Sequence, residues 1–118
     1  MSARASVAAL LLSLFVAVPV YADRRGDAKE QVEFGIQVAQ KGLWREAIYR
    51  WERATQIDPS YAAAYNNLAV AYEHEGQLDK ARAAYEKAIE LEPSNTMIKQ
   101  NYDLFKEIND RASKKDGQ

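Results

Sequence analysis

Apolar residues in the middle of the chain recur at intervals of three and four positions. The first series comprises Tyr61, Tyr65, Leu68, Ala69 and Tyr72. The second follows Gly76 and comprises Leu78, Ala81, Tyr85, Ala88, Ile89 and Leu91. Residues at this spacing lie on one face of a helix. The pattern therefore predicts two consecutive amphipathic helices.

Residues with special backbone preferences mark the ends of these helices. Gly76 is expected to end the first, because glycine adopts the positive φ of a helix C-cap without a Cβ clash. Asp79 falls in the first turn of the second, where the helix dipole favours an anion. Pro93 is expected to end that helix, and Ser94 is placed to cap the one that follows. Two antiparallel helices joined by a short glycine turn form a helical hairpin.

The same pattern occurs one step earlier in the chain. Residues 28–61 align without a gap on residues 62–95, and Trp51 to Pro59 repeats as Tyr85 to Pro93. The small residues also repeat: Ala47 and Ala54 correspond to Ala81 and Ala88. A methyl group at these positions lets paired helices approach closely and leaves Trp51 and Tyr85 to fill the space beside them. We therefore predict two hairpins of the same construction.

The sequence after the second hairpin begins as a third copy of the unit but loses most of the repeated residues. Its apolar stripe is Ile98, Tyr102, Phe105 and Ile108, with polar residues on the opposite side. Such a helix covers the last hairpin of an array and faces water on its other side. Residues 96–112 are expected to form this capping helix, ending near Ala112, and residues 113–118 a flexible tail.

The N-terminal region has the composition of a targeting segment. Residue Arg4 is followed by an uncharged run that includes Val7 to Val18, and small residues surround Tyr21. These features predict a signal peptide at residues 1–22, cleaved after Ala22, and an exported, periplasmic or secreted chain with a linker at 23–27. The alternative is a retained membrane anchor, because residues 5–22 are close to the roughly 20 apolar residues that a spanning helix needs.

The repeated pattern resembles the tetratricopeptide repeat, in which spaced aromatic and small residues precede a closing proline. The second unit carries it with Tyr65, Leu68, Ala69, Tyr72, Ala81, Tyr85 and Pro93. The first keeps Phe34, Gly35, Ala47, Trp51 and Pro59, but has Gln31 and Val38 in place of two aromatic residues. The resemblance implies an all-α superhelix, a solenoid of two helical hairpins and a capping helix.

The resemblance also implies a concave groove lined by the first helix of each unit. The residues expected there are Val32, Glu33, Ile36 and Gln40, then Asn66, Asn67, Val70 and His74, then Gln100, Asn101, Leu104 and Ile108. An apolar row beside amide side chains could bind an extended peptide through both its backbone and an apolar side chain. The alternative is that the amides are solvated polar residues on an exposed face.

Composition limits the other classes of function. The chain of 118 residues has no cysteine and a formal net charge of −1, which argues against thiolate metal sites and against nucleic acid as a partner. The single histidine, His74, lies between Glu73 and Glu75, whose side chains diverge around a helix, so no metal site is expected. No arrangement typical of a catalytic site is found, and no cofactor is expected.

Two functions follow from the repeat. The first is a non-catalytic interaction module, an exported scaffold or assembly factor that holds a peptide segment of another protein in its groove. The second is a structural protein that self-associates, because repeat arrays usually need about three units for stability. A membrane is expected as a partner only if the N-terminal segment is retained as an anchor.

Overall fold

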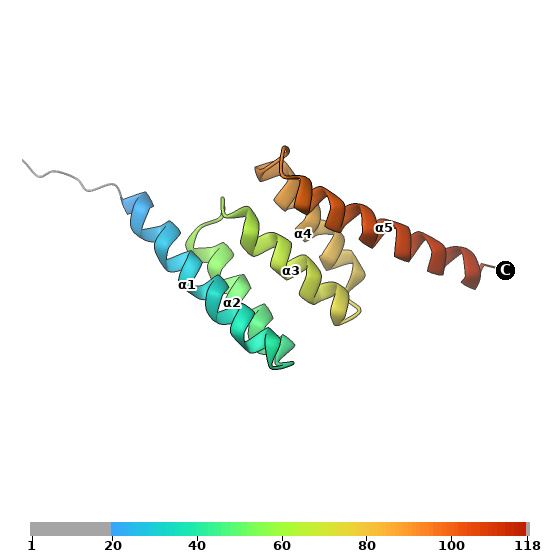
Figure 1. Cartoon of the computed structure of the whole chain (residues 1–118), viewed down its shortest axis with the longest axis horizontal. Coiled ribbons are helices and arrows are strands. Elements are labelled where there is room, and N and C mark those ends of the chain that lie inside the picture. The colour runs from blue at the N-terminus through green and yellow to red at the C-terminus, as the bar shows by residue number, and fades with distance from the viewer. Residues whose placement is uncertain (1–19, 118) are drawn as a thin grey trace, which may run out of the picture.

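The computed structural model describes residues 20–117, which form helices joined by short turns (Figure 1). The predicted signal peptide lies almost entirely outside these residues. The described part contains five helices: α1 Val20–Gln40, α2 Trp44–Ile57, α3 Ala62–His74, α4 Leu78–Leu91 and α5 Thr96–Asp116. They follow one another along the long axis of the molecule in chain order. The fold is an all-α solenoid of two hairpins and a terminal helix, as predicted.

Glycine makes the turn inside each hairpin. Gly42 and Gly76 have φ of 79° and 73°, in the left-handed region that side chains with a Cβ avoid. After each glycine the next amide closes the turn on the preceding helix: the Leu43 N–H donates to the Val38 carbonyl and the Gln77 N–H to the Tyr72 carbonyl. The equivalent bonds show that the two turns share one geometry.

Four alanines form the contact line between the paired helices. Ala47, Ala54, Ala81 and Ala88 are each 0% exposed, and Trp51 and Tyr85 beside them are 3% and 2% exposed. The two large side chains differ in what they meet on the first helix. In the first unit Trp51 lies over Gly35. In the second unit the equivalent residues are the smaller ring of Tyr85 and the larger Ala69. The first unit thus combines a larger ring with a smaller partner.

Acid and phenol groups join successive units. The Tyr72 hydroxyl of α3 donates to Glu52 Oε1 of α2 at 2.7 Å, and the Tyr102 hydroxyl of α5 donates to Glu86 Oε1 of α4 at 2.8 Å. Glu52 and Glu86 occupy equivalent positions of the two units. The same type of hydrogen bond therefore occurs at both junctions.

Three expectations about the ends of elements were wrong. Residues 23–27 are not a linker, because α1 already begins at Val20. The last helix does not end near Ala112 but continues to Asp116, so most of the expected tail is helical. No glycine or proline occurs between Pro93 and Gly117, and Lys114 and Lys115 in the last turn suit the negative end of the helix dipole.

The cap of the last helix is also one residue later than expected. Asn95, and not Ser94, is the N-cap residue of α5, and its side-chain oxygen accepts a hydrogen bond from the Ile98 N–H. Asparagine and serine are both good N-cap residues, so composition alone did not distinguish them. None of the helices in the described residues is both long enough and apolar enough to cross a membrane.

Candidate functional site

A pocket of about 340 Å³ opens where α1, α2 and α3 meet. The side chains that line it are mainly apolar, with two amides among them: Ile36, Ala39, Gln40, Trp44, Trp51, Asn67 and Val70. Four of these, Ile36, Gln40, Asn67 and Val70, are residues that the sequence placed on the groove. Ile36 and Val70 hold equivalent positions in the two units and remain 40% and 37% exposed. The structure thus brings the middle of the predicted groove together as one apolar hollow.

Two residues expected on the groove are buried. Val32 is only 5% exposed, and Asn66 is 6% exposed. The Asn66 Oδ1 atom accepts a hydrogen bond from Asn101 Nδ2 at 3.2 Å. These two amides therefore join α3 to α5 and do not form an open row, because the face of a first helix that points toward the next unit is covered by it.

The remaining predicted residues lie on the surface but outside this pocket. Glu33, His74 and Gln100 are exposed, while Leu104 and Ile108 on α5 are 57% and 51% exposed. Leu104 is equivalent to Ile36 and Val70 in the alignment of the units. The apolar row predicted from the sequence therefore has an exposed member on each of the three first helices.

Two tryptophans, Trp44 and Trp51, line the pocket, although the repeat pattern predicts only a place in the hairpin core for Trp51. The Trp51 Nε1 atom donates to the Val32 carbonyl at 3.0 Å, which satisfies the buried indole N–H and fixes the ring. Trp44 stacks on His74, with ring centroids 4.1 Å apart and an angle of 20° between the rings. The His74 Nδ1 atom lies 3.6 Å from Glu75 Oε1. The stack fixes the wall of the pocket where α2 begins.

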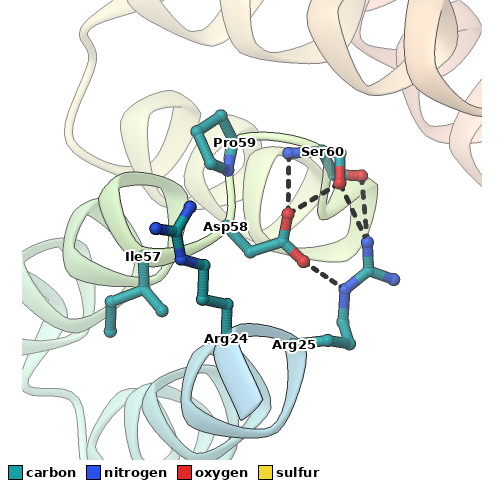
Figure 2. Close-up of a pocket in the computed structure, with 6 residues that line it drawn as sticks. All are labelled: Arg24, Arg25, Ile57, Asp58, Pro59 and Ser60. Atoms are coloured by element: carbon teal, nitrogen blue, oxygen red, sulfur yellow. Dashed lines mark hydrogen bonds and ion pairs between the residues drawn. The ribbon is translucent and has the colours of Figure 1, made fainter. Parts of the chain in front are cut away.

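The start of α1 is attached to the turn between α2 and α3, as Figure 2 shows. The Arg25 Nε atom donates to Asp58 Oδ2, and an Arg25 terminal nitrogen donates to Ser60 Oγ at 3.1 Å. Asp58 Oδ1 accepts from the Ser60 N–H and hydroxyl at 3.0 and 2.6 Å. The Arg25 guanidinium also lies 4.7 Å from the centre of the Tyr61 ring. This contact explains why the supposed linker is ordered.

The charge balance around Asp58 keeps it ionised. Partial burial by itself would raise the pKa of Asp58, but hydrogen bonds from Ser60 and Arg25 and the positive charge of Arg25 outweigh it, and the pKa lies below its usual value. A hollow of about 330 Å³ beside this turn is lined by Arg24, Arg25, Ile57, Asp58, Pro59 and Ser60. Since Arg25 is already paired, we interpret this hollow as part of a structural contact.

Comparison with known proteins agrees with this geometry. Residues 62–95 match the family described as Tetratricopeptide repeat, and residues 38–76 match a related one described as TPR repeat. Residues 38–95 therefore carry tetratricopeptide repeats. The second match crosses the junction between the hairpins, which is the region that forms the apolar pocket.

Several known proteins that carry such repeats are similar to this chain. Small glutamine-rich tetratricopeptide repeat-containing protein 2 of Mycosarcoma maydis is 33% identical over 89 residues, or 75% of this chain and 23% of that protein. Heat shock protein STI1 of Saccharomyces cerevisiae is 36% identical over 58 residues, or 49% and 10%. Protein O-mannosyl-transferase TMTC4 of Mus musculus is 36% identical over 64 residues, or 54% and 9%.

The similarity covers less than a quarter of the length of each of these three relatives. It therefore extends to the repeats and does not carry over the activity of a whole protein. Tetratricopeptide repeats are protein–protein interaction modules, and this coarse function applies to the chain.

Proposed function

We propose that the chain is a non-catalytic scaffold or assembly factor that binds an extended peptide segment of a partner protein across α1, α3 and α5. The observation that carries this proposal is the pocket lined by Ile36, Trp44 and Val70. Its volume of about 340 Å³ suits one large apolar side chain, and its walls are fixed by the Trp44–His74 stack. A site that is already formed saves the cost of ordering its side chains on binding.

The polar residues at the pocket suit the backbone of an extended peptide. Asn67 and Gln40 line the rim, and each amide offers both donors and an acceptor. Leu104 on α5 offers a second apolar contact further along the same row. A ligand of this site would therefore be an extended segment with one large apolar residue for the pocket and a second for the surface of α5.

The two tryptophans of the chain provide a direct test, because both line this pocket. Short extended peptides with a central leucine or phenylalanine are titrated into the protein, and a central serine serves as the matched peptide. We expect the tryptophan fluorescence to change only with the apolar peptides. Val70→Glu should abolish this change, and Leu78→Glu, an exposed apolar residue at the start of α4, should leave it intact.

Equal responses to the leucine and serine peptides, or an unaltered response in Val70→Glu, would contradict the groove proposal. Far-ultraviolet circular dichroism of each variant shows whether its helices are retained. If the peptide binds at another site, the fluorescence change on titration should be the same in both variants as in the wild type.

We also propose that the chain is exported. The support is the apolar segment before Asp23 and the position of the Arg25 contact, which survives removal of residues 1–22. Mass spectrometry of the chain from its native cells should find Asp23 at the N-terminus. Recovery of an intact Met1 in a soluble fraction would rule out cleavage, and recovery in the membrane fraction would support the retained anchor instead.

A further inference from the structure

The two ends of the solenoid differ in chemistry. At the C-terminal end, Lys99, Asp103 and Lys106 of α5 replace Tyr65, Ala69 and Tyr72 of α3. Asp103 and Lys106 form an ion pair at 3.3 Å, and the side chain of Asp103 is 73% exposed. The side of α5 that corresponds to the packed side of α3 is therefore charged, although Leu104 and Ile108 on the same helix are exposed.

The N-terminal end has an aromatic residue in the corresponding place. Phe34 of α1 is equivalent to Leu68 of α3, but it is 43% exposed whereas Leu68 is 4% exposed. Leu68 lies with Thr55 and Glu52 of the preceding α2, which covers it. Within the described residues no helix precedes α1, so Phe34 has only the Arg50 guanidinium over its ring, at 4.2 Å.

The aromatic surface continues onto α2. Tyr49 is 58% exposed, and the Arg50 guanidinium lies 5.5 Å from its ring centre. Arg50 is held in this position by an ion pair with Glu46 at 3.1 Å. We call the surface of Phe34, Tyr49 and Arg50 the open end. A stacked arginine between two aromatic rings is typical of the residues that contribute most to protein interfaces.

The charges that flank Phe34 favour a second copy of the same helix as the occupant. Asp27 lies seven residues before Phe34 on α1, and Lys41 lies seven residues after Phe34, in the turn that follows the end of α1 at Gln40. Seven residues are close to two helical turns, so we infer that both charges lie on the Phe34 side of the helix. Gln31 and Gln37 lie three residues on either side. In an antiparallel pair of α1 helices centred on Phe34, each Asp27 faces the Lys41 of the other copy.

The charges on α5 disfavour stacking of copies head to tail. One side of α2 and of α4 is already covered by α3 and α5 of the same chain, and the free surface of α5 combines the Asp103–Lys106 ion pair with exposed Leu104 and Ile108. A head-to-tail contact would bury the Asp103–Lys106 ion pair of α5 against the Phe34 ring of another copy, at a cost in desolvation. A two-fold arrangement instead pairs the open end with a surface of its own kind, and this closes the assembly at two chains.

We propose that two copies of this chain associate about a two-fold axis through their open ends, with the α1 helices antiparallel and Phe34 at the centre. The groove of each copy remains free in this arrangement, because the pocket residues lie on α1, α2 and α3 away from Phe34. The dimer would hold two peptide segments, or two sites of one partner, at a fixed separation.

The test is sedimentation over a series of concentrations, with the chain expressed from its full sequence and purified in the form that accumulates. The wild type should sediment as a dimer that dissociates on dilution. Phe34→Glu should raise the dissociation constant about tenfold or more, because each copy loses an apolar contact and gains a charge. Leu104→Glu, which changes an exposed apolar residue on α5, should leave the dissociation constant within about twofold, whereas it would weaken a head-to-tail contact.

A charge exchange tests the antiparallel register. Asp27→Lys and Lys41→Asp should each weaken the dimer, because each places like charges opposite one another twice. The double variant should recover the dimer, and so should an equimolar mixture of the two single variants, since their charges are then complementary.

Failure of both the double variant and the mixture to recover association would overturn the antiparallel register. A wild type that sediments as a monomer at every concentration, or a Phe34→Glu variant that associates as the wild type does, would overturn the dimer. Both are measured without a peptide, so a failure of the groove proposal would leave this result unaffected.

Discussion

Gly35 determines how closely α1 and α2 approach at the first unit. A Cβ at this position would lie 2.3 Å from Trp51 Nε1 and 2.7 Å from Trp51 Cδ1. The indole is 3% exposed and donates to the Val32 carbonyl, so it has no room to move without losing this bond. The requirement for glycine here is steric, since its φ is not positive.

We therefore expect Gly35→Ala to destabilise the protein by about 1 to 3 kcal/mol, the usual cost of overpacking a core. Gly26→Ala is the matched control, because Gly26 is also in α1 but a methyl group added there would have no neighbouring atom within 4 Å. Alanine is the better helix former, so this variant should gain about 0.5 to 1 kcal/mol. Urea unfolding followed by circular dichroism measures both, and changes of the same sign would contradict this account.

Two tyrosines, Tyr72 partly buried and Tyr85 buried, make the stability depend on pH in the alkaline range. Burial, together with the nearby carboxylates of Glu52 and Glu73, raises the pKa of Tyr72 and of Tyr85 well above the ordinary value of 10.0. A group whose pKa is raised by folding stabilises the protein fully below its unfolded pKa, and this contribution is lost as the pH rises toward the folded value.

The free energy of unfolding should therefore fall as the pH rises above 10. Tyr72→Phe cannot ionise at this position and should flatten the decline relative to the wild type. Urea unfolding at pH 9 and pH 11 gives the comparison. Parallel declines in the wild type and in a variant with both tyrosines replaced by phenylalanine would show that other groups are responsible.

At the scale of elements, the N-terminal turns of α1 depend on one contact with a distant turn. Arg25 reaches Asp58 and Ser60 between α2 and α3, whereas Arg24 makes no hydrogen bond or ion pair in the described structure. A helix end without such a contact frays easily. The contact therefore orders a segment whose composition is that of a linker.

Arg25→Ala should increase hydrogen exchange in residues 23–31, while Arg24→Ala should not. The effect on global stability should be small, below about 1 kcal/mol, because Arg25 is partly exposed and its ion pair is screened by solvent. The lowered pKa of Asp58 means that its contribution is present above the unfolded value of 3.8 and disappears as the pH falls through the folded value. The first turns of α1 should accordingly lose protection in acid, and unchanged exchange at both pH values would contradict this role.

At the scale of the whole molecule, each unit is stabilised by its contacts with the neighbouring unit. Each helix packs mainly on its neighbours in sequence, and α5 closes the second hairpin through Phe105, which is 1% exposed. The Phe105 ring lies 5.4 Å from Tyr85 and 6.3 Å from Tyr102, measured between ring centres. In such an array the loss of one junction weakens the adjacent unit most.

Phe105→Ala should therefore cost about 3 to 5 kcal/mol, as expected for truncation of a fully buried phenylalanine. Hydrogen exchange should rise in α4 and α5 more than in α1 and α2. Ile108→Ala, an exposed residue on the same helix, is the control and should change neither. A uniform rise over all four helices of the hairpins would show that the array unfolds as one unit.

The sequence by itself determined the hairpins, because their construction is local. The spacing of Tyr65, Leu68 and Tyr72, the glycine turns and the alanine positions each act within about one unit of the chain. The repetition then fixed the solenoid, since two units with the same faces pack in only one way. The exposed row of Ile36, Val70 and Leu104 could be predicted for the same reason.

The tertiary structure alone decided which polar groups pair across units. Asn66 with Asn101, Arg25 with Asp58 and Trp44 with His74 are each separated by 30 residues or more, and nothing local in either partner marks the pair. Because Asn66 pairs with Asn101, it does not line the predicted groove. Because Arg25 pairs with Asp58, the predicted linker is helical. The stack of Trp44 on His74 forms part of the pocket wall. Periodicity specifies which face of a helix is apolar, but only the packed structure specifies what each polar side chain meets.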